Sequence, residues 1–338
     1  MTMTAHTSAE TDHDLPNPEP IMQLASGFMA AKHLFAASEL GLFEALGEGP
    51  TDLRGLAART GLTARATRIS ADAMVALGML ERRGEQYVNT ETAAAFLAGG
   101  SPADLRPLLR FWDKISFPAW EDLADALARG PKHQIFDLEA ALQPIASIGI
   151  EAFSAGPSLA LPDTVDLSGN RRLLDIGGGT GSWSIAVARH CPQLSATVFE
   201  LPAVAQTAQD RIASVGLEGR IDVCAGDAGP TRCRRIRRFL VANLAHYWSP
   251  EQNRALLHRI RDVAAPGATL LIADFWTDPT HTQPVAAALM AGEFAVHLEH
   301  GDVYSVDEGI AWLQDTGWRY RDHRSLTGTM SVIVAETA

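Results

Sequence analysis

The stretch LLDIGGGTGSW, residues 173–183, is the part of the sequence from which the fold can be inferred. An apolar run leads into Asp175, and four glycines then follow within five positions, ending at Gly181. Because glycine has no Cβ, such a run allows positive φ angles and lets a ligand approach the backbone closely. The pattern predicts a strand, a tight turn and a helix, and it leaves open whether the turn holds a ligand.

The spacing of these glycines argues against two phosphate-binding motifs. A P-loop requires lysine and then serine or threonine after its last glycine, whereas Gly181 is followed by Ser182 and Trp183. A dinucleotide-binding loop reads G-x-G-x-x-G, and counting from Gly177 places Ser182 where the third glycine should stand. The pattern that remains is D-x-G-x-G-x-G, which begins at Asp175.

The sequence after residue 166 alternates between expected strands and expected helices. This alternation predicts an α/β fold with a parallel sheet covered by helices on both faces. Ligands of such sheets bind at the carboxyl ends of the strands. The expected strands are Arg172–Ile176, Ala196–Glu200, Ile221–Ala225, Phe239–Asn243, Thr269–Phe275 and Thr329–Glu336.

Two acidic residues stand at the ends of the next two expected strands. Glu200 ends the second strand in ATVFELP, and Asp227 follows the third in VCAGDA. A carboxylate at the first place can accept from both ribose hydroxyls of a nucleoside, and one at the second place can accept from an adenine amino group. Asp175 and the amides of the glycine loop would hold an amino-acid end. Together these elements predict a site for S-adenosylmethionine.

The composition of the 338 residues is that of a globular protein with a formal net charge of −12. This charge argues against nucleic-acid binding, which usually needs a basic face. The three cysteines have neither metal-finger nor redox spacing, which fits a reducing cytoplasm. No apolar stretch approaches the roughly 20 residues that cross a bilayer, and the polar start does not read as a signal peptide. We therefore expect a cytoplasmic protein that binds neither nucleic acid nor membrane, with residues 1–18 as a disordered tail.

The chain between residues 20 and 160 is expected to be almost entirely helical. Apolar residues over positions 21–46 recur at helical spacing, with a break at Gly41. Longer helices are expected at Leu105–Arg129 and Leu138–Phe153.

Two short helices and a small strand pair lie between these segments and predict a winged helix. The strands are expected at Leu80–Arg82 and Gln86–Asn89. Winged helices often bind DNA through their second helix, which here carries Arg65 and Arg68. The acidic chain and the further helical layer favour a dimerisation and lid domain over DNA binding.

Several segments together carry a family resemblance: LLDIGGGTGSWSIAVA, ATVFELP, AGDA, NLAHYWSPEQNRALL, PGATLLIADF and GDVYSVDEGIAWLQDTGW. They resemble the small-molecule O-methyltransferases of the caffeic-acid and acetylserotonin type, above all the bacterial relatives that modify secondary metabolites. The resemblance implies an all-helical winged-helix dimerisation and lid domain over residues 19–160. It implies a Rossmann-like class I methyltransferase domain over residues 161–338, and a homodimer.

The resemblance also implies a catalytic pair. The family's catalytic histidine stands in a His-Asp-Trp segment, which corresponds to His246 in AHYW, with Tyr247 in place of the acid. Asp274 in LIADF occupies the place of a supporting acid, whereas Val303 stands where plant members carry a second acid. In family members the histidine deprotonates the acceptor hydroxyl. A neutral imidazole oriented by a carboxylate suits this task, because a phenol with a pKa of about 10 is a poor nucleophile at neutral pH.

The predicted activity is transfer of a methyl group from S-adenosylmethionine to a hydroxyl of a small aromatic metabolite. N- or C-methylation, chemistry without methyl transfer and a regulatory role that only senses the cofactor are alternatives. The expected cofactor-binding residues are Asp175, Gly177, Gly179, Glu200, Leu201, Asp227, Ala228, Asn243 and Trp248. A flat apolar acceptor calls for aromatic and sulfur-containing side chains. The expected acceptor-binding residues are Met29, Phe111, Trp112, Phe117, Met290, Phe294 and His297.

Histidines near the acceptor residues raise an alternative with iron. His246 together with His297 or His300 could supply imidazole ligands, and Asp274 or Glu299 a carboxylate, a mixture that suits non-haem iron. Such a site would suit relatives that methylate carbon. Because the sequence has no compact metal-binding motif, we expect no metal.

One segment fits no part of the family pattern. Five arginines fall within the seven residues Arg232–Arg238, where the family has an acidic loop and a Gly-Phe-Asp approach to the fourth strand. One interpretation is a solvated basic loop. The other is a segment read out of frame, because such arginine-rich codons shifted by one base encode the usual pattern.

Overall fold

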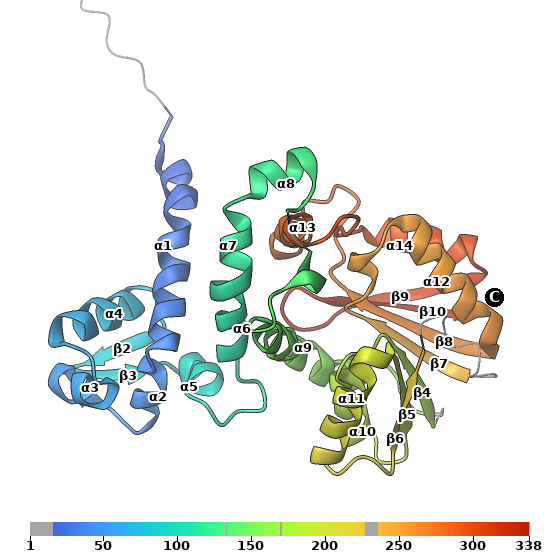
Figure 1. Ribbon diagram of the computed structural model, residues 1–338, viewed down its shortest axis with the longest axis horizontal. Coiled ribbons are helices and arrows are strands. Elements are labelled where there is room, and N and C mark those ends of the chain that lie inside the picture. The colour runs from blue at the N-terminus through green and yellow to red at the C-terminus, as the bar shows by residue number, and fades with distance from the viewer. Residues whose placement is uncertain (1–15, 133, 170, 227–235, 338) are drawn as a thin grey trace, which may run out of the picture. The chain divides into compact units, whose positions relative to one another are not determined.

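The computed structural model describes residues 16–337 apart from positions 133, 170 and 227–235 (Figure 1). The contacts divide the chain into two compact units, Met1–Thr90 and Glu91–Ala338, which are described separately here as the first and second unit. Most of the predicted tail lies outside the described residues, and the first helix begins at Glu19. None of the described helices is long and apolar enough to cross a membrane.

Helices make up most of the first unit, as the apolar spacing predicts. The expected break at Gly41 is present, because this residue has a φ of 72° and separates the first two helices. Glycine adopts this angle without steric strain. The elements in chain order are α1 (Glu19–Glu39), α2 (Leu42–Gly47), β1 (Thr51–Asp52), α3 (Leu53–Thr60), α4 (Ala64–Ala76), β2 (Leu80–Arg83) and β3 (Gln86–Asn89).

The helices α3 and α4 and the three short strands form the predicted winged helix. The strands pair antiparallel in the order β1-β3-β2; β2 and β3 are the expected pair, and β1 was not predicted. Tyr87 on β3 is buried, and its hydroxyl donates to Asp72 of α4 at 2.7 Å. Arg68 of the same helix forms an ion pair with Asp72 at 3.4 Å. Part of the positive charge of α4 is therefore neutralised inside the unit.

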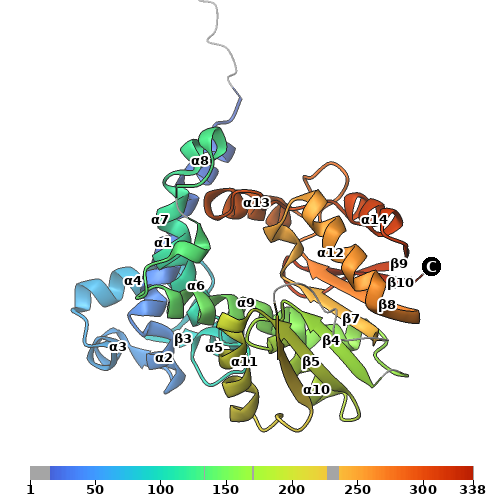
Figure 2. The same ribbon diagram turned by 45° about the vertical axis from the view of Figure 1, so that its right-hand side comes forward.

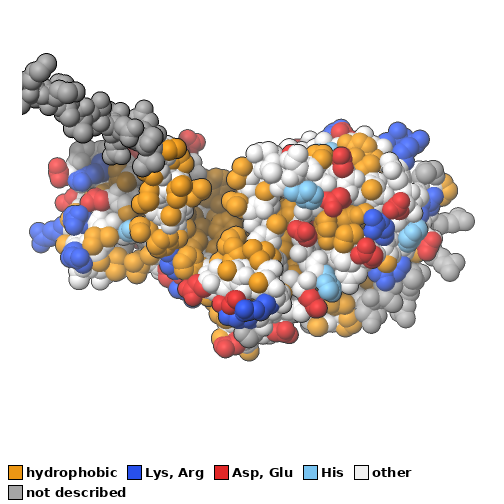
Figure 3. All heavy atoms as spheres, turned by 90° about the horizontal axis from the view of Figure 1, so that it is seen from above, with side chains coloured by type: hydrophobic (Ala, Val, Ile, Leu, Met, Phe, Trp, Pro, Cys, Tyr) orange, Lys and Arg blue, Asp and Glu red, His pale blue; other side chains and the backbone are white. Residues whose placement is uncertain are grey.

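Large apolar side chains of α1 remain exposed. Leu24 is 84% exposed and Ile21 71%, and Met22, Phe28 and Met29 are also more exposed than buried. Figure 3 shows hydrophobic side chains gathered over this helix. A contiguous apolar surface of this kind indicates a site of interaction with another protein surface.

The first part of the second unit is helical, but its helices are shorter and more often interrupted than predicted. The segment expected as one helix over Leu105–Arg129 is divided into α6 (Arg106–Phe111), a π-helical turn (Trp112–Ser116), α7 (Phe117–Trp120) and α8 (Leu123–Arg129). A π-helical turn inside an α-helix shifts the facing of the side chains that follow it, and such turns are frequent at functional sites. Helix α5 (Glu91–Leu97) precedes this segment, and a 3₁₀ turn (Ile135–Asp137) follows it.

Helix α9 (Gln143–Thr164) begins later and ends later than the predicted helix Leu138–Phe153. It continues through Pro157 and Pro162, which the sequence pattern would have placed beyond its end. The predicted domain boundary between residues 160 and 161 falls within this helix, and that division of the chain stays a prediction.

A seven-stranded sheet forms the centre of the second unit, in the order β6-β5-β4-β7-β8-β10-β9. The strands from β6 to β8 run parallel, β10 is antiparallel to β8, and β9, which is antiparallel to β10, runs in the direction of the parallel strands again. The strands are β4 (Arg172–Ile176), β5 (Ser195–Glu200), β6 (Ile221–Ala225), β7 (Ile236–Ala242), β8 (Ala264–Asp274), β9 (Trp318–Ser325) and β10 (Ser331–Thr337). The helices of this part are α10 (Ser182–His190), α11 (Pro202–Ser214), α12 (Pro250–Val263), α13 (Val285–His297) and α14 (Val306–Asp315).

Both faces of the sheet are covered, as predicted, and neighbouring strand residues point to opposite faces. Leu173 belongs to a buried apolar cluster with α9, α10, α11 and α13, whereas Leu174 belongs to the cluster with α12 and α14. Figures 1 and 2 show α10 and α11 on one side of the sheet and α12 and α14 on the other. Consecutive buried residues in one strand are the expected signature of a sheet buried on both faces.

Three predictions for the sheet need correction. The last predicted strand is antiparallel, and β9 beside it was not predicted. Strand β7 begins at Ile236, three residues before the predicted start at Phe239. Arg238 is therefore not part of a solvated loop: it is 3% exposed, and its guanidinium donates to the carbonyl oxygens of Leu167 at 2.5 Å and Ser168 at 3.0 Å. Most of the arginine-rich segment lies outside the described residues.

Candidate active site

The carboxyl ends of four adjacent strands bring the predicted site residues to one edge of the sheet. Strand β4 ends at Ile176 before the glycine loop, and β5 ends at Glu200. Strand β7 ends at Ala242 before the His246 turn, and β8 ends at Asp274. Parallel strands place these ends side by side, which is where doubly wound sheets bind ligands.

The glycine loop requires glycine because other groups approach it closely. Gly177 has a φ of 65°, and a Cβ at this position would lie 2.8 Å from Leu244 Cδ2. A Cβ at Gly178 would lie 2.7 Å from the carboxyl carbon of Asp175. By contrast, a Cβ at Gly179 would have no heavy atom within 4 Å. The loop is therefore packed against the protein on its inner side and open above Gly179.

Asp175 is completely buried beneath this loop. Ser184 of α10 donates a hydrogen bond to Asp175 Oδ2 at 2.7 Å, and Oδ1 has no hydrogen-bond partner among the described residues. Burial raises the pKa of Asp175 to about 6, against the lowering effect of Ser184, and the nearby charge of Glu200 raises it further. The side chain thus lies behind the loop rather than on its open side.

Glu200 binds the loop to the end of β5. Its Oε2 accepts from the N–H of Gly179 at 2.8 Å, and its Oε1 accepts from the N–H of Leu201 at 2.7 Å. A carboxylate has about four acceptor sites, so both oxygens can accept further hydrogen bonds. Leu201 itself is 52% exposed.

Arg211 of α11 connects the glycine loop to helix α9. Its Nη1 donates to Thr180 Oγ1 at 2.6 Å and to Ser182 Oγ at 2.8 Å. Its Nη2 forms an ion pair with Glu151 of α9. Sequence analysis did not identify this network, because its members come from three separated segments without a shared motif.

The imidazole of His246 is held by Asp274. Their Nδ1 and Oδ1 atoms lie 2.7 Å apart, and both side chains are buried. Asp274 Oδ2 also accepts from the backbone N–H groups of Leu244, Ala245 and His246 at 3.2, 2.8 and 3.4 Å. Asp274 Oδ1 accepts from the N–H of Phe275 at 2.8 Å. One carboxylate therefore fixes both the ring and the turn that carries it.

Aromatic rings surround His246. The ring of Phe294 is stacked on the imidazole, with centroids 4.1 Å apart and an interplanar angle of 10°. Phe275 approaches edge-on at 5.5 Å, and the ring of Tyr247 lies 4.4 Å away. Burial, and to a lesser extent Asp274, raises the pKa of Tyr247 to about 12, so this phenol is neutral at physiological pH. The residue that replaces the family's acid thus adds no negative charge beside the histidine.

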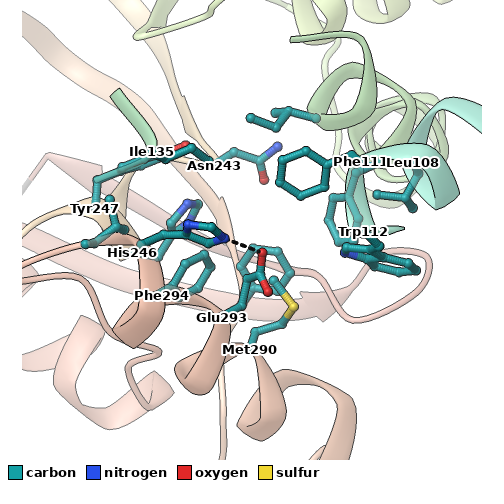
Figure 4. A pocket seen from close by; sticks show the side chains of 15 residues that line it. Leu108, Phe111, Trp112, Ile135, Asn243, His246, Tyr247, Met290, Glu293 and Phe294 are labelled. Carbon is teal, nitrogen blue, oxygen red and sulfur yellow. Dashed lines mark ion pairs between the residues drawn. The ribbon is translucent and has the colours of Figure 1, made fainter. Parts of the chain in front are cut away.

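A pocket of about 590 Å³, measured with its open mouth, lies beside His246 (Figure 4). Its lining is mostly aromatic and aliphatic and comes from the segments around α6 and α9, the strand ends and α13. Five predicted acceptor residues line it, namely Phe111, Trp112, Met290, Phe294 and His297. Phe117 lies in α7 and is not among the lining residues, and Met29 belongs to the first unit.

Two polar residues of the pocket have positions that the sequence did not reveal. Asn243, predicted for the cofactor, lines this pocket, and its Nδ2 donates to Ser154 Oγ of α9 at 2.6 Å. It has a φ of 51°, an angle that asparagine tolerates better than most residues. Glu293 was not predicted at all, although its spacing of four residues from His297 on one helix could have indicated a pair.

Three further predicted cofactor residues are not brought to the pocket beside His246 or are not described by the structure. Trp248 packs against the apolar cluster of α12 and α14, and its carbonyl oxygen accepts from the hydroxyl of Tyr304 at 2.6 Å. It is not among the residues that line the pocket beside His246. Asp227 and Ala228 lie outside the described residues.

The described residues do not supply the ligands that the alternative with iron requires. Within the described ranges, no three histidine, cysteine, aspartate or glutamate side chains come together in a way that could hold a metal ion. Glu299 and His300 are exposed, and His246 and His297 are each paired with a different carboxylate.

Comparison with known proteins identifies both parts of the chain. Residues 22–99 match the O-methyltransferase dimerisation domain, and residues 158–319 match the O-methyltransferase domain. The chain is 34% identical to 3-hydroxy-5-methyl-1-naphthoate 3-O-methyltransferase of Streptomyces sahachiroi over an alignment of 325 residues that covers 93% of this chain and 93% of the relative. It is 31% identical to the N,N-dimethyltransferase OxyT of Streptomyces rimosus, covering 89% of this chain and 90% of the relative.

Solved structures agree with the sequence matches. Human N-acetylserotonin methyltransferase in complex with S-adenosylmethionine superposes with a TM-score of 0.82 at 25% identity, covering 98% of this chain and all of the human chain. The predicted fold, a dimerisation domain followed by a class I α/β methyltransferase domain, is thereby confirmed. The chain belongs to the S-adenosylmethionine-dependent O-methyltransferases that carry an O-methyltransferase dimerisation domain.

Proposed function

We propose that this enzyme methylates a hydroxyl group of a small, flat aromatic metabolite and that His246 is the general base. The observation that carries the proposal is the buried pair of His246 and Asp274 at the wall of a mostly apolar pocket. Two relatives are named as methyltransferases of a naphthoate and of acetylserotonin, both aromatic compounds.

The hydrogen bonds of Asp274 support a distinct role for each ring nitrogen of His246. Because Asp274 accepts from four backbone N–H groups, it acts as a carboxylate, and His246 Nδ1 is the atom that donates to it. His246 Nε2 then carries a lone pair that can take the proton of an acceptor hydroxyl. The carboxylate also stabilises the imidazolium that this proton transfer creates.

The residues at the ends of β4 and β5 fit the cofactor. The open space above Gly179 leaves room for a ligand, and the oxygens of Glu200 can accept from ribose hydroxyls while holding the loop. We assign Asp175 to the shape of the loop, because its carboxylate lies behind Gly178. When bound, S-adenosylmethionine supplies an electrophilic methyl group. We propose that Gly177, Leu201 and the other predicted cofactor residues also contribute to binding the cofactor.

The pocket favours an acceptor that is flat and mostly apolar. Phe111, Trp112, Phe294 and Met290 offer aromatic faces and a polarizable sulfur to a ring system. The polar groups are few, which is typical of sites that use them for orientation. N-methylation is a second candidate, because one relative is named as an N,N-dimethyltransferase.

Mass spectrometry tests this function. The purified enzyme is incubated with methyl-labelled S-adenosylmethionine and a panel of naphthols, hydroxyanthraquinones and matched aromatic amines. We expect one labelled methyl group on a hydroxyl oxygen, located by fragmentation of the product. Label on nitrogen would replace the O-methylation proposal with the second candidate, and the absence of label from every aromatic acceptor would contradict the proposed acceptor class.

We also infer that the enzyme is a homodimer formed through the first unit. The match to a dimerisation domain over residues 22–99 and the exposed apolar side chains of α1 support this inference. The dimer would remove from water a surface that is costly to expose on a monomer.

A further inference from the structure

The acceptor pocket contains a second polar pair, formed by Glu293 and His297 on helix α13. The two residues are four positions apart, and His297 Nε2 lies 3.3 Å from Glu293 Oε1. Each side chain is more than nine-tenths buried, and both line the pocket. The dashed line in Figure 4 marks this ion pair. The proposed proton transfer at His246 does not use it.

Glu293 is held in place by two hydrogen-bond donors, one in the π-helical turn before α7 and one in α7 itself. The hydroxyl of Ser116 donates to Oε1 at 2.5 Å, and the indole N–H of Trp120 donates to Oε2 at 2.5 Å. Burial by itself would raise the pKa of Glu293, but the adjacent His297 and the hydrogen bonds from Ser116 and Trp120 outweigh it and lower the pKa. The pocket therefore contains a fixed carboxylate at neutral pH.

His297 presents a buried nitrogen that lacks a hydrogen bond. Its Nε2 has no hydrogen-bond partner within the described part of the chain, although it lies near Glu293 Oε1. A buried polar atom without a hydrogen bond costs about 1–3 kcal/mol. Since the atom lies in the wall of a pocket, a bound molecule can supply the missing partner.

We propose that Glu293 and His297 bind a second hydroxyl group of the acceptor, so that the preferred substrate is an aromatic diol or polyphenol. One hydroxyl is methylated beside His246, and the other is recognised by the pair on α13. This inference rests on the proposed function, since it presumes that the pocket takes an aromatic acceptor.

A hydroxyl matches the pair better than other common polar groups. Glu293 only accepts hydrogen bonds, and the nearby Nε2 of His297 can donate, so one group that both donates and accepts satisfies both atoms. Ser116 shows that a hydroxyl fits against Glu293 Oε1. An acceptor carboxylate offers no donor and would face the negative charge of Glu293 in a buried site. The pair therefore favours diols over hydroxyaromatic acids of the kind named for the naphthoate relative.

The experiment compares acceptors that differ by one hydroxyl. Binding of naphthalenediols, naphthols and hydroxynaphthoates is measured by fluorescence titration of the wild-type protein saturated with S-adenosylhomocysteine. The diol that binds most tightly is then compared with the two naphthols obtained by removing either hydroxyl. We expect one of these removals to weaken binding by about 10- to 100-fold, because the buried Nε2 of His297 is then left without a hydrogen-bond partner.

Two variants assign this preference to the pair. Glu293→Gln keeps the shape but removes the charge, and it should weaken binding of the diol about tenfold while naphthol binding stays within twofold. His297→Phe should act in the same direction. Met290→Leu is the matched control on the same helix, and it should change binding of diol and naphthol by the same factor.

The outcomes separate this inference from the proposed function. Equal binding of diols and naphthols by the wild-type protein would overturn the inference and leave the proposed function standing. An equal loss of both ligands in Glu293→Gln would show that the pair only supports the fold of the pocket. If no aromatic compound binds and none is methylated, the proposed acceptor class itself is wrong, and this inference falls with it.

Discussion

His246 Nδ1 lies 2.7 Å from Asp274 Oδ1, and the same carboxylate accepts hydrogen bonds from the backbone of the turn that carries the histidine. The position of the ring therefore depends on one residue at the end of β8. A base that is oriented through its other nitrogen needs no movement to receive a proton. This relationship determines what each substitution in the pair should do.

Replacement of His246 by Gln should lower kcat by about 10²- to 10⁴-fold, the usual contribution of a positioned proton acceptor. Affinity for S-adenosylhomocysteine should stay within about threefold, because the ring lines the acceptor pocket. Activity should recover in part at high pH, where a phenolic acceptor ionises without help. Turnover with the identified acceptor, measured from pH 6 to 10, tests this, and a variant with wild-type turnover would contradict the role of the histidine.

Asp274→Asn should also lower kcat, because the amide disturbs the tautomer of His246. Asn253→Ala provides the control: Asn253 Nδ2 donates to the carbonyl oxygens of Ala245 and Trp248 in the same turn without touching the imidazole. This control should lower thermal stability and reduce kcat far less than Asp274→Asn. Equal losses of kcat would indicate that the carboxylate acts only by holding the turn.

Glu200→Ala should weaken binding of S-adenosylmethionine or its demethylated product at least tenfold. The change removes the acceptor for ribose hydroxyls, and hydrogen bonds to a charged group contribute about 1.5–3 kcal/mol each. It also frees the N–H of Gly179, which Glu200 holds at 2.8 Å. Calorimetric titration measures the affinity, with circular dichroism to show that the variant is folded. Unchanged affinity in a folded variant would mean that the cofactor site is misassigned.

Arg211→Ala should weaken cofactor binding by about tenfold, because it removes the hydrogen bonds that Arg211 donates to Thr180 and Ser182 of the glycine loop. The matched control is Arg220→Ala, since Arg220 Nη2 donates to the carbonyl oxygens of Cys191 and Leu194 in the loop before β5. That loop lies at the amino ends of the strands. Calorimetry should find weaker cofactor binding for the first variant alone, whereas equal affinities would exclude a role for Arg211 in the loop.

The central strands could be predicted from the sequence because they are buried on both faces. Strand β4 has the predicted bounds and contains four consecutive buried residues. Strand β6 also has the predicted bounds, although it lies at an edge of the sheet and only Ile221 is fully buried in it. Strand β9 was missed because, at this edge of the sheet, Arg319 and Arg321 alternate with Trp318 and Tyr320 and leave no apolar run. A charged edge strand does not show the apolar run that marks a central one.

Site residues that follow the ends of parallel strands could be predicted from the sequence. Site residues whose position depends on packing between distant segments could not. His246 and Asp274 were found because each follows the end of a parallel strand, and such ends meet at one edge. Glu293 was missed because a glutamate on a helix usually faces solvent. Its burial depends on Ser116 and Trp120, which lie 177 and 173 residues away in the chain. The sequence alone gives no sign of that contact.

The proposed homodimer can be tested at α1. Leu24→Asp places a charge in the exposed apolar surface of this helix, where Leu24 is 84% exposed, and it should shift the mass in solution toward the monomer. Leu127→Asp is the control, because Leu127 is 68% exposed but lies in α8 of the second unit. Light scattering at micromolar concentration measures both. A wild-type protein of monomer mass would contradict the dimer, and a Leu24→Asp variant that stays dimeric would exclude α1 from the interface.

The last prediction concerns the buried carboxyl group of Asp175. Burial raises its pKa in the folded protein to about 6 from the ordinary value of 3.8, so the folded state binds this proton more tightly than the unfolded state. Stability from this group is therefore fully present below about pH 4 and is lost as the pH rises through 6. A shift of roughly two pKa units corresponds to about 3 kcal/mol of unfolding free energy.

Asp175→Asn should remove this dependence, because the amide does not titrate. The unfolding free energies of both cofactor-free proteins are measured by urea titration between pH 4.5 and 7.5. The protein concentration is the same in every titration. The wild-type value should fall relative to that of the variant as the pH rises. Ser184→Ala should steepen the fall, because Ser184 donates to Asp175 at 2.7 Å and this bond lowers the pKa. If the wild-type protein and Asp175→Asn keep a constant difference across this range, Asp175 is already ionised at the lowest pH, and the loop is not stabilised by its proton.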